Sequence, residues 1–324
     1  IADSEADDLL ETFRANDIRY LTYIGGNDSA DTLLQMGRRA AERGYELRTI
    51  AVPKTIDNDL PVTDHSPGYG SIARYVAMAT MDSAQDTESM PTMYPVKIIE
   101  VMGRNAGWVA AAAALGKRCP VDAPHLVYVP ERPLSPERLL RDVERVYRTV
   151  GHVVAVVAET VRDESGHPFA DPALSGETDA FGHPLLRGTA GAMCRIIQAE
   201  LGLRARYDKP GSLQRMSSLC ISPVDLDEAN QVGRAAVRIA LADESNRMVT
   251  LIRDGNEPYR SHTESAPLEE IANRQRLLPD AFLNDDGTDV TDAFREYALP
   301  LLGPSPLPAY TRLSASRAPV RSPV

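Results

Sequence analysis

The sequence predicts an α/β fold with mainly parallel sheets in two lobes, on three observations. Short apolar runs alternate with stretches of helical periodicity along most of the chain. Glycine turns follow two of the apolar runs, at the end where an open parallel sheet gathers its ligands. The length of 324 residues suits one large domain or two of about 150 residues. A doubly wound arrangement follows, because parallel strands need helical crossovers on the faces of their sheet.

The first part of the chain is expected to form a βαβ unit behind a leading helix. Ser4 and Asp7 have the spacing of a capping-box variant, which marks a helix start. Gly44 suits the position just after a helix end. The expected elements are a helix over 4–16, a buried strand over 18–24, a turn over 25–29, a helix over 32–43 and a strand over 45–52.

The alternation continues through the rest of the chain. The run HVVAVVAE over 152–159 is a strongly apolar strand, whereas the polar segment 162–187 is expected to be a long loop. The tail after residue 303 is rich in Pro and Ser, which favours partial disorder. Further helices are expected over 69–88, 105–116, 135–149, 188–201 and 224–243, and strands over 97–102, 125–129 and 247–252.

Composition and charge exclude several classes of protein. The formal net charge is −11, which argues against a nucleic-acid groove. No apolar run approaches the length of a membrane helix, and the N-terminus lacks the features of a secretory signal. The three cysteines have no metal-binding spacing, so we interpret them as buried thiols of a cytoplasmic protein.

The motif GGNDS over 25–29 is the first candidate site. Gly25 and Gly26 let the backbone approach an anion at a helix start. Asp28 would repel a phosphate unless a cation lies between them, so Asn27 or Asp28 with Mg²⁺ would resolve the conflict. Taken alone, the motif is better interpreted as a glycine turn that caps a helix.

The motif PKTIDND over 53–59 carries more chemistry. Lys54 offers a cation for phosphate, and Thr55 is a short hydrogen-bond donor. Asp57 and Asp59 are two residues apart, so an extended backbone would point both the same way, toward a shared metal or a base-and-ligand pair. A polar turn is the simpler alternative. Because the motif follows the strand next to GGNDS, we favour a phosphoryl or pyrophosphoryl site.

The motif EVMGRNAGW over 100–108 repeats the layout of a strand followed by a glycine turn. Arg104 could form a bidentate contact with phosphate, and Gly103 permits close approach to a sugar. Taken alone, a turn with a solvated Arg104 is the favoured interpretation.

The order and spacing of GGNDS, PKTIDND, PGYGS and EVMGRNAGW resemble the 6-phosphofructokinase family, and in particular its pyrophosphate-dependent type. The resemblance runs from about residue 18 to about residue 300 and includes PLEEIAN and DVTDAF near its end. It implies two Rossmann-like lobes. One is a phosphoryl-donor lobe of residues 1–68 plus 214–290, and the other is a fructose 6-phosphate lobe of residues 69–213 plus 291–324.

The resemblance also implies roles for individual residues. Asp57 matches the general base that takes the proton of the sugar 1-hydroxyl. Thr55 matches a residue close to the reacting phosphoryl group, and Asp59 matches a position near Mg²⁺. The residues that match fructose 6-phosphate contacts are Met102, Gly103, Arg104, Glu159 and Arg215, together with Arg206, which would reach into a neighbouring subunit.

The donor is expected to be pyrophosphate. ATP-type members usually carry Gly where this chain has Asp28, and Gly where it has Lys54. A carboxylate at 28 would crowd and repel the α-phosphate of a nucleotide, and a lysine at 54 offers the charge that pyrophosphate needs.

The chain departs from the family pattern at three places, one of which is the segment Tyr94-Pro95-Val96-Lys97, where ATP-type members have a second cross-subunit arginine. Asn27 stands where members commonly have Asp at the metal, so we expect metal binding to rely on Asp28 and Asp59. The family's first strand and its donor loop are missing from the sequence, so we expect an N-terminal truncation. Such a fragment would expose a sheet edge and could be inactive alone.

The sequence therefore predicts a Mg²⁺-dependent transfer from pyrophosphate to fructose 6-phosphate in a homo-oligomer, either a dimer or a tetramer. Two alternatives within the family remain, namely ATP dependence and a non-catalytic regulatory subunit. A metal-dependent glycosyltransferase, suggested by the DxD spacing of Asp57 and Asp59, ranks last because it leaves the other motifs unexplained.

Overall fold

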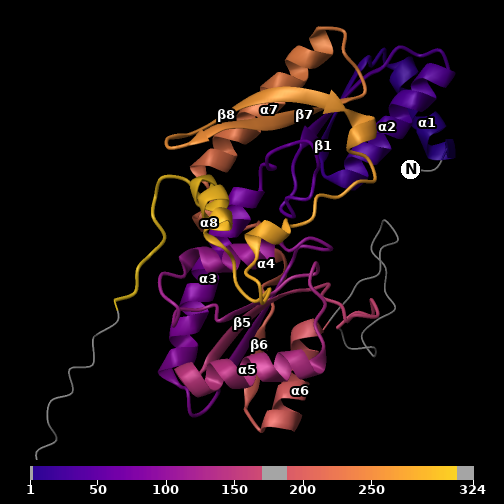
Figure 1. Ribbon diagram of the computed structural model, residues 1–324. Helices are drawn as coiled ribbons and strands as arrows, with labels where there is room; N and C mark the ends of the chain where they lie inside the picture. Colours follow the sequence, from indigo (N-terminus) through magenta and orange to yellow (C-terminus); the bar gives the residue numbers. More distant parts are fainter. Residues whose placement is uncertain (1–2, 170–187, 312–324) are drawn as a thin grey trace, which may run out of the picture.

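The computed structural model describes residues 3–169 and 188–311, which contain two four-stranded sheets. The sheets lie in opposite halves of the molecule, with α4 (Trp108–Ala112) and α8 (Asp292–Ala298) between them (Figure 1). The arrangement confirms the predicted α/β fold with mainly parallel sheets. Among the described residues, no helix is long and apolar enough to cross a membrane.

The strands of the first sheet are β1 (Tyr20–Gly25), β2 (Arg48–Pro53), β7 (Arg247–Asn256) and β8 (Tyr259–Pro267). Those of the second sheet are β3 (Val96–Val101), β4 (Leu126–Tyr128), β5 (Val153–Ala158) and β6 (Ala205–Asp208). The other helices are α1 (Asp3–Ala15), α2 (Asn27–Glu42), α3 (Tyr69–Ser89), α5 (Pro136–Val150), α6 (Thr189–Leu201) and α7 (Pro223–Leu241).

The first sheet has the order β1-β2-β7-β8, and only the β7–β8 pair is antiparallel. Its side chains alternate between two faces, as a strand requires. Ile50 and Val52 pack with α7, whereas Ala51 and Met248 pack with Leu33 of α2. Each face of the sheet is thus covered by one helix.

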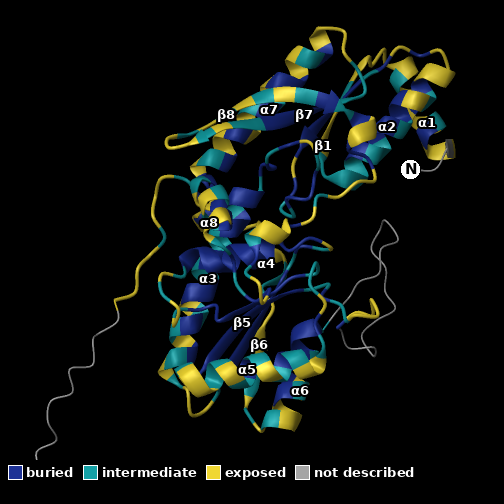
Figure 2. Ribbon diagram, in the orientation of Figure 1, coloured by how far each residue is buried: buried dark blue, intermediate teal, exposed yellow. Residues whose placement is uncertain are grey.

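The second sheet has the order β4-β5-β3-β6, and all its pairs are parallel. Every residue of β5 is fully buried, as its continuous apolar run predicts for a strand covered on both faces. Helices α5 and α6 pack on one face, and α3 and α4 pack on the other. Figure 2 shows the central strand β5 as buried and the outer sides of α5 and α6 as largely exposed.

Three predicted elements differ from the structure. Helix α2 begins at Asn27 rather than at 32, so the second half of GGNDS forms its first turn. The helix expected over 105–116 is α4 followed by a 3₁₀ helix over Ala113–Gly116. The prediction that 18–24 is buried was wrong, because β1 is an edge strand and Ile24 is 62% exposed.

Several elements were not predicted. Strand β6 and helix α8 are short, and β8 is a long antiparallel strand whose sequence is mostly polar. Most of the predicted loop over 162–187, and most of the tail after 303, lie outside the described residues.

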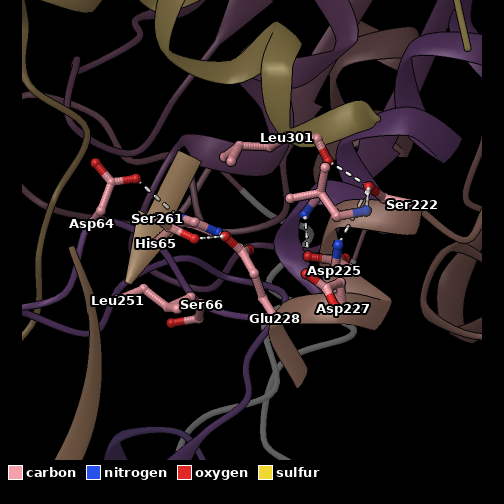
Figure 3. A network of polar contacts seen from close by, with 12 residues as sticks. Asp64, His65, Ser66, Ser222, Asp225, Asp227, Glu228, Leu251, Ser261 and Leu301 are labelled. Atoms are coloured by element: carbon pink, nitrogen blue, oxygen red, sulfur yellow. Dashed lines mark hydrogen bonds and ion pairs between the residues drawn. The ribbon is translucent and has the colours of Figure 1, made fainter. Parts of the chain in front are cut away.

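The two halves are joined at the start of α3. The carboxylate of Asp225 in α7 accepts hydrogen bonds from the backbone N–H groups of Gly70 (3.2 Å) and Ser71 (2.6 Å) (Figure 3). These groups have no partner within a helix, so the carboxylate caps α3. A Cβ at Gly70 would lie 2.3 Å from the carbonyl oxygen of Leu301, so this contact requires glycine.

His65, fully buried, lies between two carboxylates in the same region (Figure 3). Its Nδ1 is 2.8 Å from Asp64, and its Nε2 is 2.5 Å from Glu228 of α7. Burial lowers the pKa of His65, but the hydrogen bonds and charges of the two carboxylates outweigh it, so the pKa is raised. Arg253 also pairs with Asp64 (2.8 Å), and Tyr259 donates to Glu228 (2.7 Å).

We expect Glu228→Gln to lower the free energy of unfolding by about 3 kcal/mol at pH 6, because it breaks a buried ion pair. A raised folded-state pKa means that the stabilisation by His65 is complete below its unfolded pKa of about 6.5 and is lost as the pH rises through the folded value. The loss should therefore shrink at pH 9. Urea unfolding at both pH values tests this, with Asp227→Asn on the exposed side of α7 as control. An equal loss at both pH values would contradict deprotonation of His65 over this pH range.

Candidate active site

The first turn of α2 and the loop after β2 lie against each other. The backbone N–H of Lys54 donates to the carbonyl of Gly25 (3.1 Å), and the amide of Asn27 donates to the carboxylate of Asp59 (2.9 Å). A Cβ at Gly25 would lie 2.0 Å from the Oγ of Ser29, so glycine is needed for this turn into the helix. The two motifs therefore meet at the carboxyl ends of β1 and β2, where the sequence predicted a shared site.

The loop after β2 is sharply bent rather than extended. Asn58 has a φ of 54°, so the prediction of an extended segment between Asp57 and Asp59 was wrong. The side chain of Asn58 compensates by donating to Tyr297 (3.0 Å) and accepting from the backbone N–H of Ser66 (3.2 Å). Asparagine tolerates this conformation better than most residues.

Arg276, which is far from the PKTIDND motif in the sequence, binds the loop after β2. Its guanidinium donates to the carbonyl of Asn58 (2.9 Å), to that of Thr63 (2.9 Å) and to that of Asp64. It also lies 4.5 Å from the ring centroid of Trp108, whose indole N–H donates to the Arg276 carbonyl (3.0 Å). Sequence reasoning missed Arg276, since it belongs to no motif.

Thr55 is almost fully buried and contacts the backbone of Asp57. Its hydroxyl accepts a hydrogen bond from the backbone N–H of Asp57 (3.2 Å), and its backbone bridges to Gly68. Gly68 has a φ of 112° and a Cβ there would lie 3.2 Å from the Thr55 carbonyl, which explains the glycine. The PGYGS motif thus supports the PKTIDND loop.

The carboxyl of Asp57 is the most strongly perturbed in the site. Burial raises its pKa to about 7, and the charges of Asp59 and Glu159 act in the same direction. Arg104 and Lys54 lower it, but less. A carboxyl with a pKa near 7 can both hold and accept a proton at neutral pH.

Asp59 is buried and its pKa is also raised, chiefly by burial. Besides Asn27, it accepts a hydrogen bond from the side chain of Gln275 (3.1 Å), which sequence reasoning also missed. Gln275 and Arg276 are adjacent, so one segment contacts both the backbone and a carboxylate of the motif.

The MGR turn after β3 faces this group of residues. Gly103 has a φ of 145° and Arg104 a φ of 40°, so the turn is held in an unusual backbone conformation. The guanidinium of Arg104 lies 3.2 Å from the carboxylate of Asp28, which joins the turn of one half to the first helical turn of the other. The hydroxyl of Thr160 donates to the Arg104 carbonyl.

Two of the predicted sugar contacts, Glu159 and Arg215, belong to segments that contact the MGR turn. The backbone N–H of Met102 donates to Gln214 (3.3 Å), so the 3₁₀ helix over Gly211–Arg215, which ends at exposed Arg215, docks beside it. Glu159 follows β5, and burial raises its pKa although the charge of Lys209 lowers it.

Arg206 lies elsewhere. It pairs with Asp86 and lies 5.3 Å from the ring centroid of Tyr94, so a single chain does not bring it to Asp57. The side chain of Lys54 is exposed and makes no hydrogen bond or ion pair with the residues that the structure describes. Its ammonium group is available to a ligand.

The residues around Asp59 suit a hard cation such as Mg²⁺. The Oδ1 of Asn27 is buried and has no hydrogen-bond partner within the described ranges, although its amide group binds Asp59. Amide and carboxylate oxygens are the ligands that Mg²⁺ prefers. In the described part of the chain, however, no three His, Cys, Asp or Glu side chains are grouped as a complete metal site.

The comparisons with known proteins agree with this geometry. A family model described as phosphofructokinase matches residues 2–242. The chain is 42% identical to a pyrophosphate–fructose 6-phosphate 1-phosphotransferase of Halomonas elongata over 303 residues, which covers 93% of this chain and 72% of the relative. The chain belongs to the phosphofructokinase family.

Two further phosphofructokinases are similar to the chain. The crystal structure of a pyrophosphate-dependent phosphofructokinase from Marinobacter aquaeolei matches with a TM-score of 0.83 and 36% identity, over 96% of this chain and 74% of that one. An ATP-dependent 6-phosphofructokinase of Amycolatopsis methanolica is 33% identical over 257 residues, which covers 76% of this chain and 54% of the relative.

We expect Asp57→Asn to stabilise the ligand-free chain at pH 7.5 and not at pH 4. The unfolded carboxyl ionises near pH 4, whereas the folded one keeps its proton up to about pH 7. Stability therefore falls as the pH rises between these values, and asparagine removes that loss. The gain should be on the order of 1–2 kcal/mol, after allowance for the partial exposure of Asp57.

Urea unfolding in EDTA at pH 4 and pH 7.5 measures the difference. Asp8→Asn, on the exposed side of α1, is the matched control and should show no such gain. A variant no more stable than the parent chain at pH 7.5 would contradict the assigned perturbation of Asp57.

Proposed function

We propose that this chain transfers a phosphoryl group from pyrophosphate to the 1-hydroxyl of fructose 6-phosphate, giving fructose 1,6-bisphosphate and phosphate. The observation that carries the proposal is the contact of Asp28 with Arg104 at 3.2 Å. It brings the turn expected to hold the donor to the turn expected to hold the sugar. Asp57, whose pKa is about 7, lies where the charges of both Arg104 and Lys54 reach it.

Asp57 acts as the general base. It accepts the proton of the sugar 1-hydroxyl as that oxygen attacks the phosphorus, and the P–O–P bond of pyrophosphate breaks to release phosphate. Phosphoryl transfer depends mostly on positioning and on stabilising charge. The bend at Asn58 and the hydrogen bonds from Arg276 hold the carboxylate for this role.

The other residues bind and orient the two substrates. Lys54 and Thr55 contact the transferred phosphoryl group, and Gly25 and Gly26 let the backbone approach the donor. The sugar contacts are proposed to be Met102, Gly103, Arg104, Glu159 and Arg215 of this chain and Arg206 of a second subunit. Mg²⁺, held by Asn27 and Asp59 with Asp28 nearby, would neutralise the charge of the donor.

The two proposed lobes each contain one of the two sheets. We propose residues 1–68 plus 214–290 as the donor lobe and 69–213 plus 291–324 as the fructose 6-phosphate lobe. The first sheet falls in the donor ranges and the second in the other ranges, which supports the division. The three cysteines are free thiols, which supports a cytoplasmic location.

We propose that the chain forms a homo-oligomer. Large apolar side chains are at least half exposed in the segment that carries Arg215, as expected for a surface that contacts another subunit. They are Leu213, Met216, Leu219, Ile221 and Leu226.

Pyrophosphate is favoured over ATP by charge. Asp28 places a carboxylate in the donor turn, and exposed Lys54 has an ammonium group free for the terminal phosphates. The ATP-dependent reaction is the second candidate, and the relative from Amycolatopsis methanolica is the observation that favours it.

A donor-exchange assay tests the proposal. Formation of fructose 1,6-bisphosphate from fructose 6-phosphate and Mg²⁺ is followed with pyrophosphate or ATP as the sole donor. Turnover with pyrophosphate alone supports it, and turnover with ATP alone moves the function to the second candidate. A folded chain that binds fructose 6-phosphate but turns over neither donor would favour a non-catalytic subunit.

We expect Asp57→Asn to lower kcat by about 10²–10⁴-fold with little change in the KM for fructose 6-phosphate, because a general base acts in the transition state. Steady-state kinetics measure both constants. Asp227→Asn should retain the parent values, since Asp227 is exposed on α7. Retention of kcat in Asp57→Asn would contradict the role of the base.

We expect Lys54→Ala to raise the KM for pyrophosphate about tenfold, corresponding to about 1.4 kcal/mol, and to leave the KM for fructose 6-phosphate nearly unchanged. Arg234→Ala, an exposed cation on α7, controls for net charge. An equal rise in both KM values, or no rise, would show that Lys54 does not bind the donor.

A further inference from the structure

A cavity lined by arginines lies against α5, in the half of the molecule that contains the second sheet. Its volume is about 320 Å³, which is room for a small organic molecule. Four arginines line it, although the formal net charge of the whole chain is −11. The lining residues that matter here are Arg132, Arg138, Arg141, Arg145, Asp142 and the loop 285–287.

The spacing of the arginines follows from the helix. Arg138, Arg141 and Arg145 are three and four residues apart, so they lie on one side of α5. The loop 285–287 faces them, and the guanidinium of Arg138 donates to the carbonyl of Asp286 in that loop. The cavity is therefore built by two fixed elements rather than by one flexible surface segment.

Two of the lining carboxylates already have partners. Asp142 accepts a hydrogen bond from Tyr128 (3.2 Å) and pairs with Arg145 (3.3 Å), which also pairs with Asp286 (3.4 Å). The charges of Asp142 and Asp286 are therefore partly compensated by the charge of Arg145. Arg138 also lies 3.9 Å from Asp142, so Arg132 and Arg141 are the arginines least engaged with carboxylates inside the cavity, and Asp285 is the remaining lining carboxylate.

Two arginines keep unused donors. Arg132 pairs with Asp280 through Nη2 (3.3 Å), but its Nε is buried and has no hydrogen-bond partner among the described residues. The side chain of Arg141 makes no hydrogen bond or ion pair within the described ranges, and its charge acts on Glu137 one turn away. A buried, unpaired N–H is costly, and an anion would satisfy it.

We propose that this cavity binds a small organic phosphate, with the phosphate held by Arg132 and Arg141. Guanidinium groups match the oxygens of a phosphate in bidentate geometry. The cavity involves none of the residues assigned to the proposed reaction, so this inference goes beyond the proposed function and does not depend on it.

The cavity is nevertheless linked to the segment after the MGR turn through Glu131, the residue before Arg132. Glu131 accepts hydrogen bonds from the backbone N–H of Gly107 (2.9 Å) and from that of Leu278 (2.8 Å). Gly107 follows the MGR turn, and Leu278 follows the segment of Gln275 and Arg276. An anion bound at Arg132 would therefore lie next to a carboxylate that connects these two segments.

Isothermal titration calorimetry with 3-phosphoglycerate as the probe tests the proposal on the full chain, without any donor or sugar present. We expect saturable binding that weakens at least tenfold in Arg141→Ala. Arg141 is exposed, and the unchanged thermal stability of that variant would show that the fold is retained. Arg148→Ala, on the same helix but outside the cavity, is the matched control and should bind normally.

A second variant tests the sign of the charge effect. Asp285→Asn removes a carboxylate from the cavity, so it should tighten binding of the probe about threefold. Absence of saturable binding, or binding that is the same in Arg141→Ala and the parent chain, would overturn the proposal. Weaker binding in Asp285→Asn would also contradict it.

Discussion

The site depends on the guanidinium of Arg276. It binds the carbonyls of three residues in the loop after β2, and its own backbone N–H donates to the carbonyl of Asp59 (2.7 Å). A loop with a residue at positive φ and two carboxylates would otherwise have many accessible conformations. One side chain, packed on Trp108, fixes the backbone that carries both Asp57 and Asp59.

The same loop explains the electrostatics of the site. Asp59 and Glu159 are close enough to raise the cost of ionising Asp57, and burial raises the pKa of all three carboxyls. Arg104 and Lys54 offset only part of this effect. Such an arrangement costs stability in the ligand-free chain, and functional sites commonly accept that cost. In the proposed reaction, the charges of a bound donor and its cation would change the pKa values of these carboxyls.

Much of the fold could be predicted from local patterns, and the long-range contacts could not. The apolar run of β5 identifies a buried strand directly, whereas β8 is mostly polar and lies at an edge, so its sequence lacks the apolar pattern of a strand. The start of α2 was missed because Asn27 and Asp28 are poor helix formers, although they suit a first turn. In the site, the motifs identified residues 25–28, 54–59 and 102–104. Arg276 could not be found this way, because it lies 218 residues from Asn58 and no local pattern marks it.

Transfer of label from ³²P-labelled pyrophosphate tests the central claim most directly. The chain is mixed with labelled pyrophosphate, Mg²⁺ and fructose 6-phosphate, and the reaction is stopped in acid within one turnover. Label is expected in the 1-phosphate of fructose 1,6-bisphosphate and not on the protein, because Asp57 moves a proton and forms no bond to phosphorus. Labelled protein, or label released only as phosphate while the sugar stays unlabelled, would contradict it.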